Sequence, residues 1–114
     1  MARKLVLVVD DELPVLELLT KLINQLGHAA ETARDAVEAL RKVETTKFDL
    51  VLTDLHMPGM KGDELAHEIK KRTPGKPGVL ITGSEPPSLS QNIGRVLLKP
   101  FSMRKLNEVI DSLT

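Results

Sequence analysis

Cysteine is absent from this 114-residue chain, and aromatic side chains are limited to Phe48 and Phe101. Without cysteine there is no disulfide, no thiolate nucleophile and no thiolate metal site. The scarcity of aromatic rings requires an aliphatic core, and it removes the platforms on which proteins stack bases or sugars. Thiol chemistry and recognition by stacking are therefore excluded.

The chain also lacks net charge and long hydrophobic runs. Its 16 basic and 16 acidic residues cancel, so no overall field favours nucleic acid or an anionic membrane. The apolar run near the start, Leu5 to Val9, is too short for the core of a signal peptide or for a membrane span. We expect one soluble cytoplasmic domain covering residues 1–114, with no membrane partner and no direct contact with nucleic acid.

Strand-like and helix-like patterns alternate along the whole chain. Short, largely β-branched or apolar runs predict strands, and apolar residues at helical spacing predict helices. The predicted strands are 5–9, 28–32, 50–52, 78–82 and 95–98, and the predicted helices are 14–26, 35–43, 61–72 and 102–113. This alternation is typical of a parallel sheet covered by helices on both faces.

The predicted helices carry recognisable ends. Asp35 and Ser102 are expected to cap the helices that follow them, and Gly27 is expected to close the helix at 14–26. The predicted inward stripe of that helix is Val15, Leu18, Leu19, Leu22, Ile23 and Leu26. Residues 84–94 contain two adjacent prolines and leave room for about one helical turn, so a helix between the last two strands is short or absent.

Acidic residues stand where buried strands end. Asp10 and Asp11 follow one strand, and Asp54 follows the run at 50–52 just before a Pro-Gly turn. In an open parallel sheet the carboxyl ends of the strands meet at one edge, where ligands bind. That edge would also collect Thr82 and Lys99.

This set of residues predicts phosphoryl-transfer chemistry. Three carboxylates in one pocket repel one another unless a cation lies among them, and oxygen ligands of this kind suit a hard ion, above all Mg²⁺. The metal and Lys99 would neutralise phosphoryl oxygens, Thr82 could hydrogen-bond one of them, and a carboxylate could act as nucleophile.

Four motifs carry a resemblance to a known family over the whole chain. They are Val8-Val9-Asp10-Asp11-Glu12, Thr53 to Gly62, Ile81-Thr82-Gly83 and Leu98-Lys99-Pro100-Phe101. In this order they resemble the receiver domain of two-component response regulators. The resemblance implies a flavodoxin-like, doubly wound, five-stranded parallel sheet of order 2-1-3-4-5, which the chemotaxis member of the family exemplifies.

The same resemblance implies the acceptor and the metal ligands. Asp54 would be the phosphoacceptor, taking a phosphoryl group from a sensor histidine kinase or a phosphotransfer protein. Asp11 would bind Mg²⁺ directly and Asp10 through water, and the backbone carbonyl of His56 would complete the ligands. The domain would then be a signalling domain, not an enzyme, with only self-catalysed phosphotransfer and slow autodephosphorylation.

The resemblance also implies the remaining contacts. Thr82 and Lys99 would contact the phosphoryl group, and the peptide bond before Pro100 would be cis.

The chain departs from the family in the region that reports phosphorylation. Val96 stands where an aromatic ring is usual, Gly83 replaces the usual alanine, and the segment between Thr82 and Lys99 is short. A switch needs two states with different contacts. We therefore expect a domain that is phosphorylated but passes the signal on by another route, such as phosphate relay.

The sequence is also compatible with two other functions. One is a receiver fold that acts as an adaptor or dimerisation module independently of phosphorylation. The other is a flavodoxin-like nucleotide binder, although Asp10, Asp11 and Glu12 would repel a phosphate after the first strand. The oligomeric state, the cognate kinase and any output domain are left open by the sequence.

Overall fold

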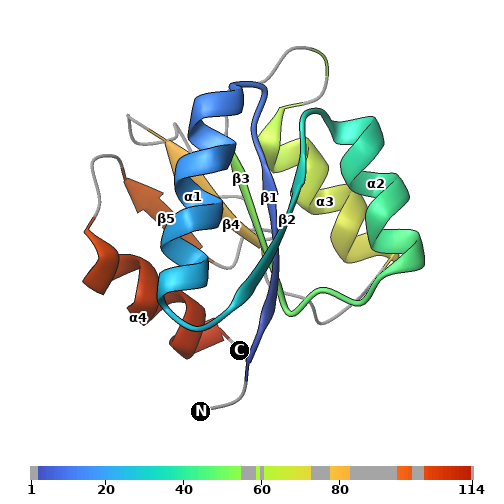
Figure 1. Ribbon diagram of the computed structural model, residues 1–114. Coiled ribbons are helices and arrows are strands. Elements are labelled where there is room, and N and C mark those ends of the chain that lie inside the picture. Colours follow the sequence, from blue (N-terminus) through green and yellow to red (C-terminus); the bar gives the residue numbers. More distant parts are fainter. Residues whose placement is uncertain are drawn as a thin grey trace.

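The computed structural model describes residues 3–54, 59, 61–72, 78–82, 95–98 and 102–113, with the strands at 78–82 and 95–98 described by their backbone. Along the chain the elements are β1 Leu5–Val9, α1 Leu13–Gln25, β2 Ala29–Ala33, α2 Ala36–Thr45, β3 Leu50–Asp54, α3 Gly62–Arg72, β4 Gly78–Thr82, β5 Arg95–Leu98 and α4 Met103–Leu113. Figure 1 shows their arrangement. The expectation of a short or absent helix between β4 and β5 concerns residues outside the described ranges.

All the strands belong to one parallel sheet. Its five strands lie in the order β2-β1-β3-β4-β5, and every neighbouring pair is parallel. This confirms the predicted fold class and strand order. Each strand ends at the same edge of the sheet as its neighbours, so residues far apart in sequence meet there.

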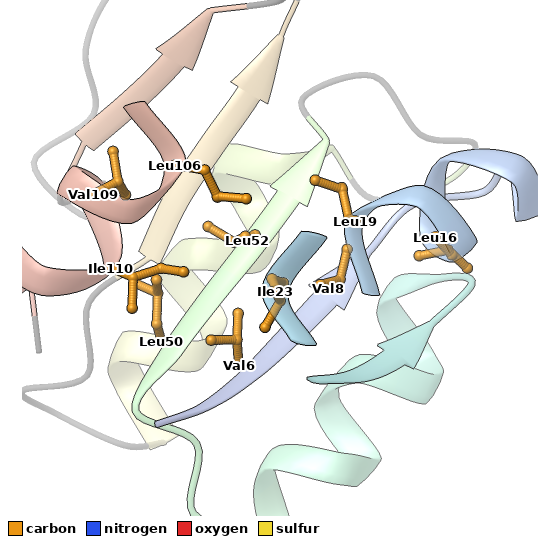
Figure 2. Close-up of a cluster of buried hydrophobic side chains, with 10 residues drawn as sticks. All are labelled: Val6, Val8, Leu16, Leu19, Ile23, Leu50, Leu52, Leu106, Val109 and Ile110. Carbon is orange, nitrogen blue, oxygen red and sulfur yellow. The ribbon is translucent and has the colours of Figure 1, made fainter. Parts of the chain in front are cut away.

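Alternate residues of the central strands serve two separate cores. Val6 and Val8 of β1 pack on one face with residues of α1 and α4, as Figure 2 shows. Leu7 and Val9 pack on the other face with residues of α2 and α3. Successive side chains of a strand point to opposite faces, so a continuous apolar run is what a sheet covered on both sides requires.

One predicted helix face is partly wrong. Leu19 and Ile23 of α1 are buried as expected, but Leu18 is 56% exposed, whereas Leu16, which the predicted stripe omitted, is 2% exposed. The stripe on the sheet is Leu16, Leu19 and Ile23, with spacings of three and four residues. A helix this rich in leucine offers two adjacent apolar stripes, and packing on β1 selects between them.

The helix ends behave as their residue types predict. Asp35 accepts the backbone N–H of Glu38 at 2.8 Å, and Ser102 accepts that of Lys105 at 3.1 Å. Gly27 has φ +91°, the left-handed conformation in which glycine ends a helix without steric cost. These local contacts fix where α2 and α4 begin and where α1 gives way to β2.

The start of β1 is held by side chains from two other segments. Lys4 donates its backbone N–H to Nδ1 of His28 at 3.0 Å, and Leu5 donates its own to Oδ2 of Asp49 at 2.9 Å. Asp49 in turn donates its N–H to the carbonyl of Leu5 at 2.8 Å. These bonds set the register of β1 at the end of the sheet opposite the acidic residues.

Candidate functional site

The pairing of β1 with β3 brings two acidic residues to the same level. Val9 is paired with Thr53, so the next residues, Asp10 and Asp54, leave neighbouring strands side by side. The N–H of Asp10 donates to the carbonyl of Ala33 at 3.1 Å, which continues the β1–β2 ladder up to this residue. Asp54 is the last residue of β3 and is half-buried.

The next strands continue the same edge. Asp54 is paired with Ile81 of β4, and Thr82, the last residue of β4, is paired with Leu98 of β5. The backbone of Thr82 thus lies one register position beyond the partner of Asp54. Lys99 and His56 lie outside the described residues, as do Gly83 and Pro100. The backbone of Val96 is paired with Leu80.

Asp10 is the most enclosed acid of the edge. It is 3% exposed, and its Oδ1 accepts the backbone N–H of Glu12 at 2.9 Å. A carboxylate held by a backbone donor two residues ahead has a fixed orientation and needs no rearrangement to bind a ligand. Asp11, in contrast, is exposed.

Glu12 joins this cluster, although the sequence pattern did not predict it as a ligand. Carboxylate oxygens of Asp10, Asp11 and Glu12 lie within 4.8 Å of one another, and the carboxyl group of Asp54 is outside that group. Its position in the sequence could have indicated this, because Glu12 directly follows the two aspartates. The backbone N–H of Glu12 also donates to Oδ1 of Asp10, so the two residues lie close together at this turn.

The donor chemistry fits a hard divalent cation. The cluster offers carboxylate oxygens only, and Mg²⁺ and Ca²⁺ are bound by such oxygens, whereas softer metals prefer nitrogen or sulfur. One carboxylate of the cluster, that of Asp10, is buried and fixed while the other two are exposed, so an ion bound there could keep several of its waters. Mg²⁺ characteristically does so.

The parallel sheet, its carboxyl edge and the acidic cluster together are typical of one class of protein. The comparison with known families identifies the same class. The sequence model of the response regulator receiver domain matches residues 6–111, and the chain belongs to this family. The transcriptional regulatory protein GlrR of Escherichia coli is 36% identical over 110 residues, which cover 92% of this chain and 25% of that protein.

Further relatives and solved structures extend this finding. The alkaline phosphatase synthesis regulator PhoP of Bacillus subtilis is 30% identical over 115 residues, covering 96% of this chain and 48% of that protein. The regulator TrrA of Thermotoga maritima, solved in complex with Mg²⁺-BeF, is 34% identical with a TM-score of 0.91, covering 97% of this chain and 99% of that one. The chemotaxis protein CheY4 of Vibrio cholerae is 27% identical with a TM-score of 0.91, covering 99% and 100%.

This chain spans only a quarter to about half of the curated relatives GlrR and PhoP. It is a receiver domain of a two-component signalling protein. No helix in the described part of the chain is both long and apolar enough to cross a membrane.

Proposed function

We propose that Asp54 is the phosphoacceptor of a two-component phosphorelay. The observation that carries this is the pairing of Val9 with Thr53, which sets Asp54 beside the buried Asp10 at the carboxyl edge of the sheet. A carboxylate oxygen of Asp54 would attack the phosphorus of a phosphohistidine on a partner protein. The P–N bond would break, the imidazole would leave, and an acyl phosphate would form on Asp54.

Mg²⁺ would be held by Asp10, Asp11, Asp54 and the backbone carbonyl of His56. Three observations support this: the buried, oriented carboxylate of Asp10, the oxygen-only cluster around it, and the Mg²⁺-BeF complex of TrrA. The bound ion supplies positive charge against the phosphoryl oxygens. The fixed carboxylate of Asp10 would hold the ion near the end of β1, where Asp54 also ends its strand.

Thr82 and Lys99 would contact the phosphoryl group directly. The backbone position of Thr82, one register step beyond the partner of Asp54, supports its part, and Lys99 follows the last residue of β5. A hydroxyl and an ammonium group stabilise the charge that spreads over the equatorial oxygens during transfer. The domain would catalyse its own phosphorylation and the slow hydrolysis of the acyl phosphate.

The partner would be a sensor histidine kinase or a phosphotransfer protein, and the encounter would take place in the cytoplasm. Residues 1–114 would form a single receiver domain without direct contact with nucleic acid. Because Val96 and Gly83 replace the residues typical of the family's switch, the domain would act through phosphate relay.

The test is to incubate the chain with acetyl phosphate and Mg²⁺ and to measure its intact mass. We expect one added phosphoryl group, absent from Asp54→Ala and retained by the control Asp111→Ala, which removes an exposed acid of α4. No addition to the wild type, with acetyl phosphate or with a phosphohistidine donor, would refute the proposal. A partner complex unaffected by Asp54→Ala would instead favour the phosphorylation-independent adaptor.

A further inference from the structure

The edge strand β2 has backbone groups that point away from the sheet. Ala29 donates its N–H to the carbonyl of Lys4, and the carbonyl of Ala33 accepts the N–H of Asp10, so residues 29 and 33 face β1. Backbone groups alternate in direction along a strand, so Ala30 and Thr32 face outward. Lys42 confirms this direction, because its Nζ donates to the carbonyl of Thr32 at 2.6 Å from the far side of β2.

Lys42 covers only one end of this edge. Within the described part of the chain, the N–H and C=O of Ala30 and the N–H of Thr32 make no hydrogen bond. Native proteins usually protect such an edge with a charged side chain, a bulge or a covering helix. Here the protection stops at Thr32, and the open edge at Ala30 can take another strand.

A pocket lies beside this open edge. Its volume is about 520 Å³, within the range of pockets that hold ligands. It is lined by Leu13, Leu16, Glu17 and Thr20 of α1, Ala30, Glu31 and Thr32 of β2, and Lys42 of α2. Figure 1 shows β2 between these two helices. The pocket therefore joins an apolar floor to the outward backbone of β2.

One polar atom of the pocket wall has no partner. Oγ1 of Thr20 is buried and makes no hydrogen bond, and it belongs to the same pocket as Ala30. A buried hydroxyl without a partner costs free energy, so Thr20 is a weak point of the wall between α1 and β2.

The charge of the pocket selects the occupant. Glu17 and Glu31 line it against a single cation, Lys42, whose charge is already engaged by Glu31 and Glu38, each at 3.8 Å. The side chains that line the pocket therefore carry a net negative charge. Paired backbone donors and acceptors fit the amide groups of an extended chain, and the surplus carboxylate fits a lysine or arginine side chain.

We propose that the β2 edge and its pocket bind an extended, basic peptide segment of a partner protein by adding it to the sheet as a further strand. Ala30 would supply the first backbone bonds, and the N–H of Thr32 the next. The ammonium group of Lys42 would mark the end of the added strand. This surface is separate from the phosphoacceptor edge and goes beyond the proposed function.

The test uses ¹⁵N-labelled protein titrated with the blocked peptide TVKVT and, separately, with its acidic counterpart TVEVT. We expect saturable shift changes at the amides of Ala30, Thr32 and Thr20 with TVKVT. Replacing the lysine by glutamate should raise the Kd by about twofold to fivefold or more, because about that factor corresponds to the free energy of one exposed charge pair. Saturable changes centred elsewhere, or none at all, would overturn the proposal.

Two proline variants give a matched pair. Ala30→Pro removes an outward N–H and leaves the β1–β2 ladder intact, so it should fold and lose TVKVT binding. Ala29→Pro removes the N–H that bonds Lys4 and should lower the Tm roughly 4 °C or more below that of Ala30→Pro. Unchanged binding by folded Ala30→Pro contradicts the proposal.

A charge-reversed variant tests the same surface without removing any backbone N–H. The double variant Glu17→Lys and Glu31→Lys reverses two pocket charges, and it should abolish the preference for TVKVT over TVEVT. Asp54→Ala should bind TVKVT as the wild type does. Loss of phosphorylation and loss of peptide binding can therefore be told apart.

Discussion

The backbone N–H of Glu12 donates to Oδ1 of Asp10 at 2.9 Å, and this one bond shapes the acidic edge. It orients the buried carboxylate of Asp10, and the carboxylate of the exposed Glu12 lies in the same cluster. The two acids should therefore contribute unequally to a metal site, although they are only two positions apart. A fixed ligand gives up no side-chain freedom on binding, while an exposed one is screened by water and salt.

We expect Asp10→Asn to lower the apparent Mg²⁺ affinity for phosphorylation by about tenfold or more, because a fixed charged ligand is lost. Glu12→Gln should lower it by no more than about fivefold, because its charge is exposed. The measurement is the initial rate of modification by acetyl phosphate against Mg²⁺ concentration, with Asp111→Asn as control. Equal effects of the two substitutions would contradict the role assigned to the Asp10–Glu12 bond.

Asp35 caps α2, and Asp35→Ala should destabilise the protein by about 1 kcal/mol through the loss of the bond from Glu38. Urea unfolding followed by circular dichroism measures this change. Asp35→Ser keeps a capping oxygen and should remain close to the wild type. A loss as large with serine as with alanine would show that the bond to Glu38 is not the cause.

Asp49 holds the start of β1, so Asp49→Ala should cost about 1–2 kcal/mol by leaving the N–H of Leu5 without its acceptor. Asp49→Asn keeps a side-chain carbonyl and should cost less. Phosphorylation of the folded protein should not change in either variant, because Asp49 precedes the start of β3 and Asp54 is its last residue. Slower phosphorylation of a fully folded Asp49 variant would show that the start of β3 is coupled to the acidic edge.

Leu16 and Leu18 provide a test of the face that α1 presents to the sheet. Leu16→Ala should cost about 2–5 kcal/mol, as for other buried leucines, because Leu16 is 2% exposed. Leu18→Ala should cost no more than about 0.5 kcal/mol, because Leu18 is 56% exposed. Thermal unfolding of both variants gives the comparison. A larger loss for Leu18 would restore the stripe that the sequence pattern predicted.

Much of this fold follows from local pattern. The apolar run at β1, the capping residues Asp35 and Ser102 and the glycine that ends α1 all act within a few residues of chain. Local contacts of this kind are visible in a sequence because the interacting atoms are close in the chain. The alternation of strands and helices then specifies a parallel sheet, and with it the edge at which Asp10 and Asp54 end their strands.

Tertiary structure decided what depends on distant pairing. The pairing of Val9 with Thr53 places Asp10 beside Asp54, and no local sequence pattern predicts this register. The choice of Leu16 over Leu18 required a sheet to pack against, and the bond from Leu5 to Asp49 joins residues 44 positions apart. The sequence by itself determined the elements and the acids at their ends. Only the pairing of the strands, which rests on contacts across the whole chain, determined which acids meet.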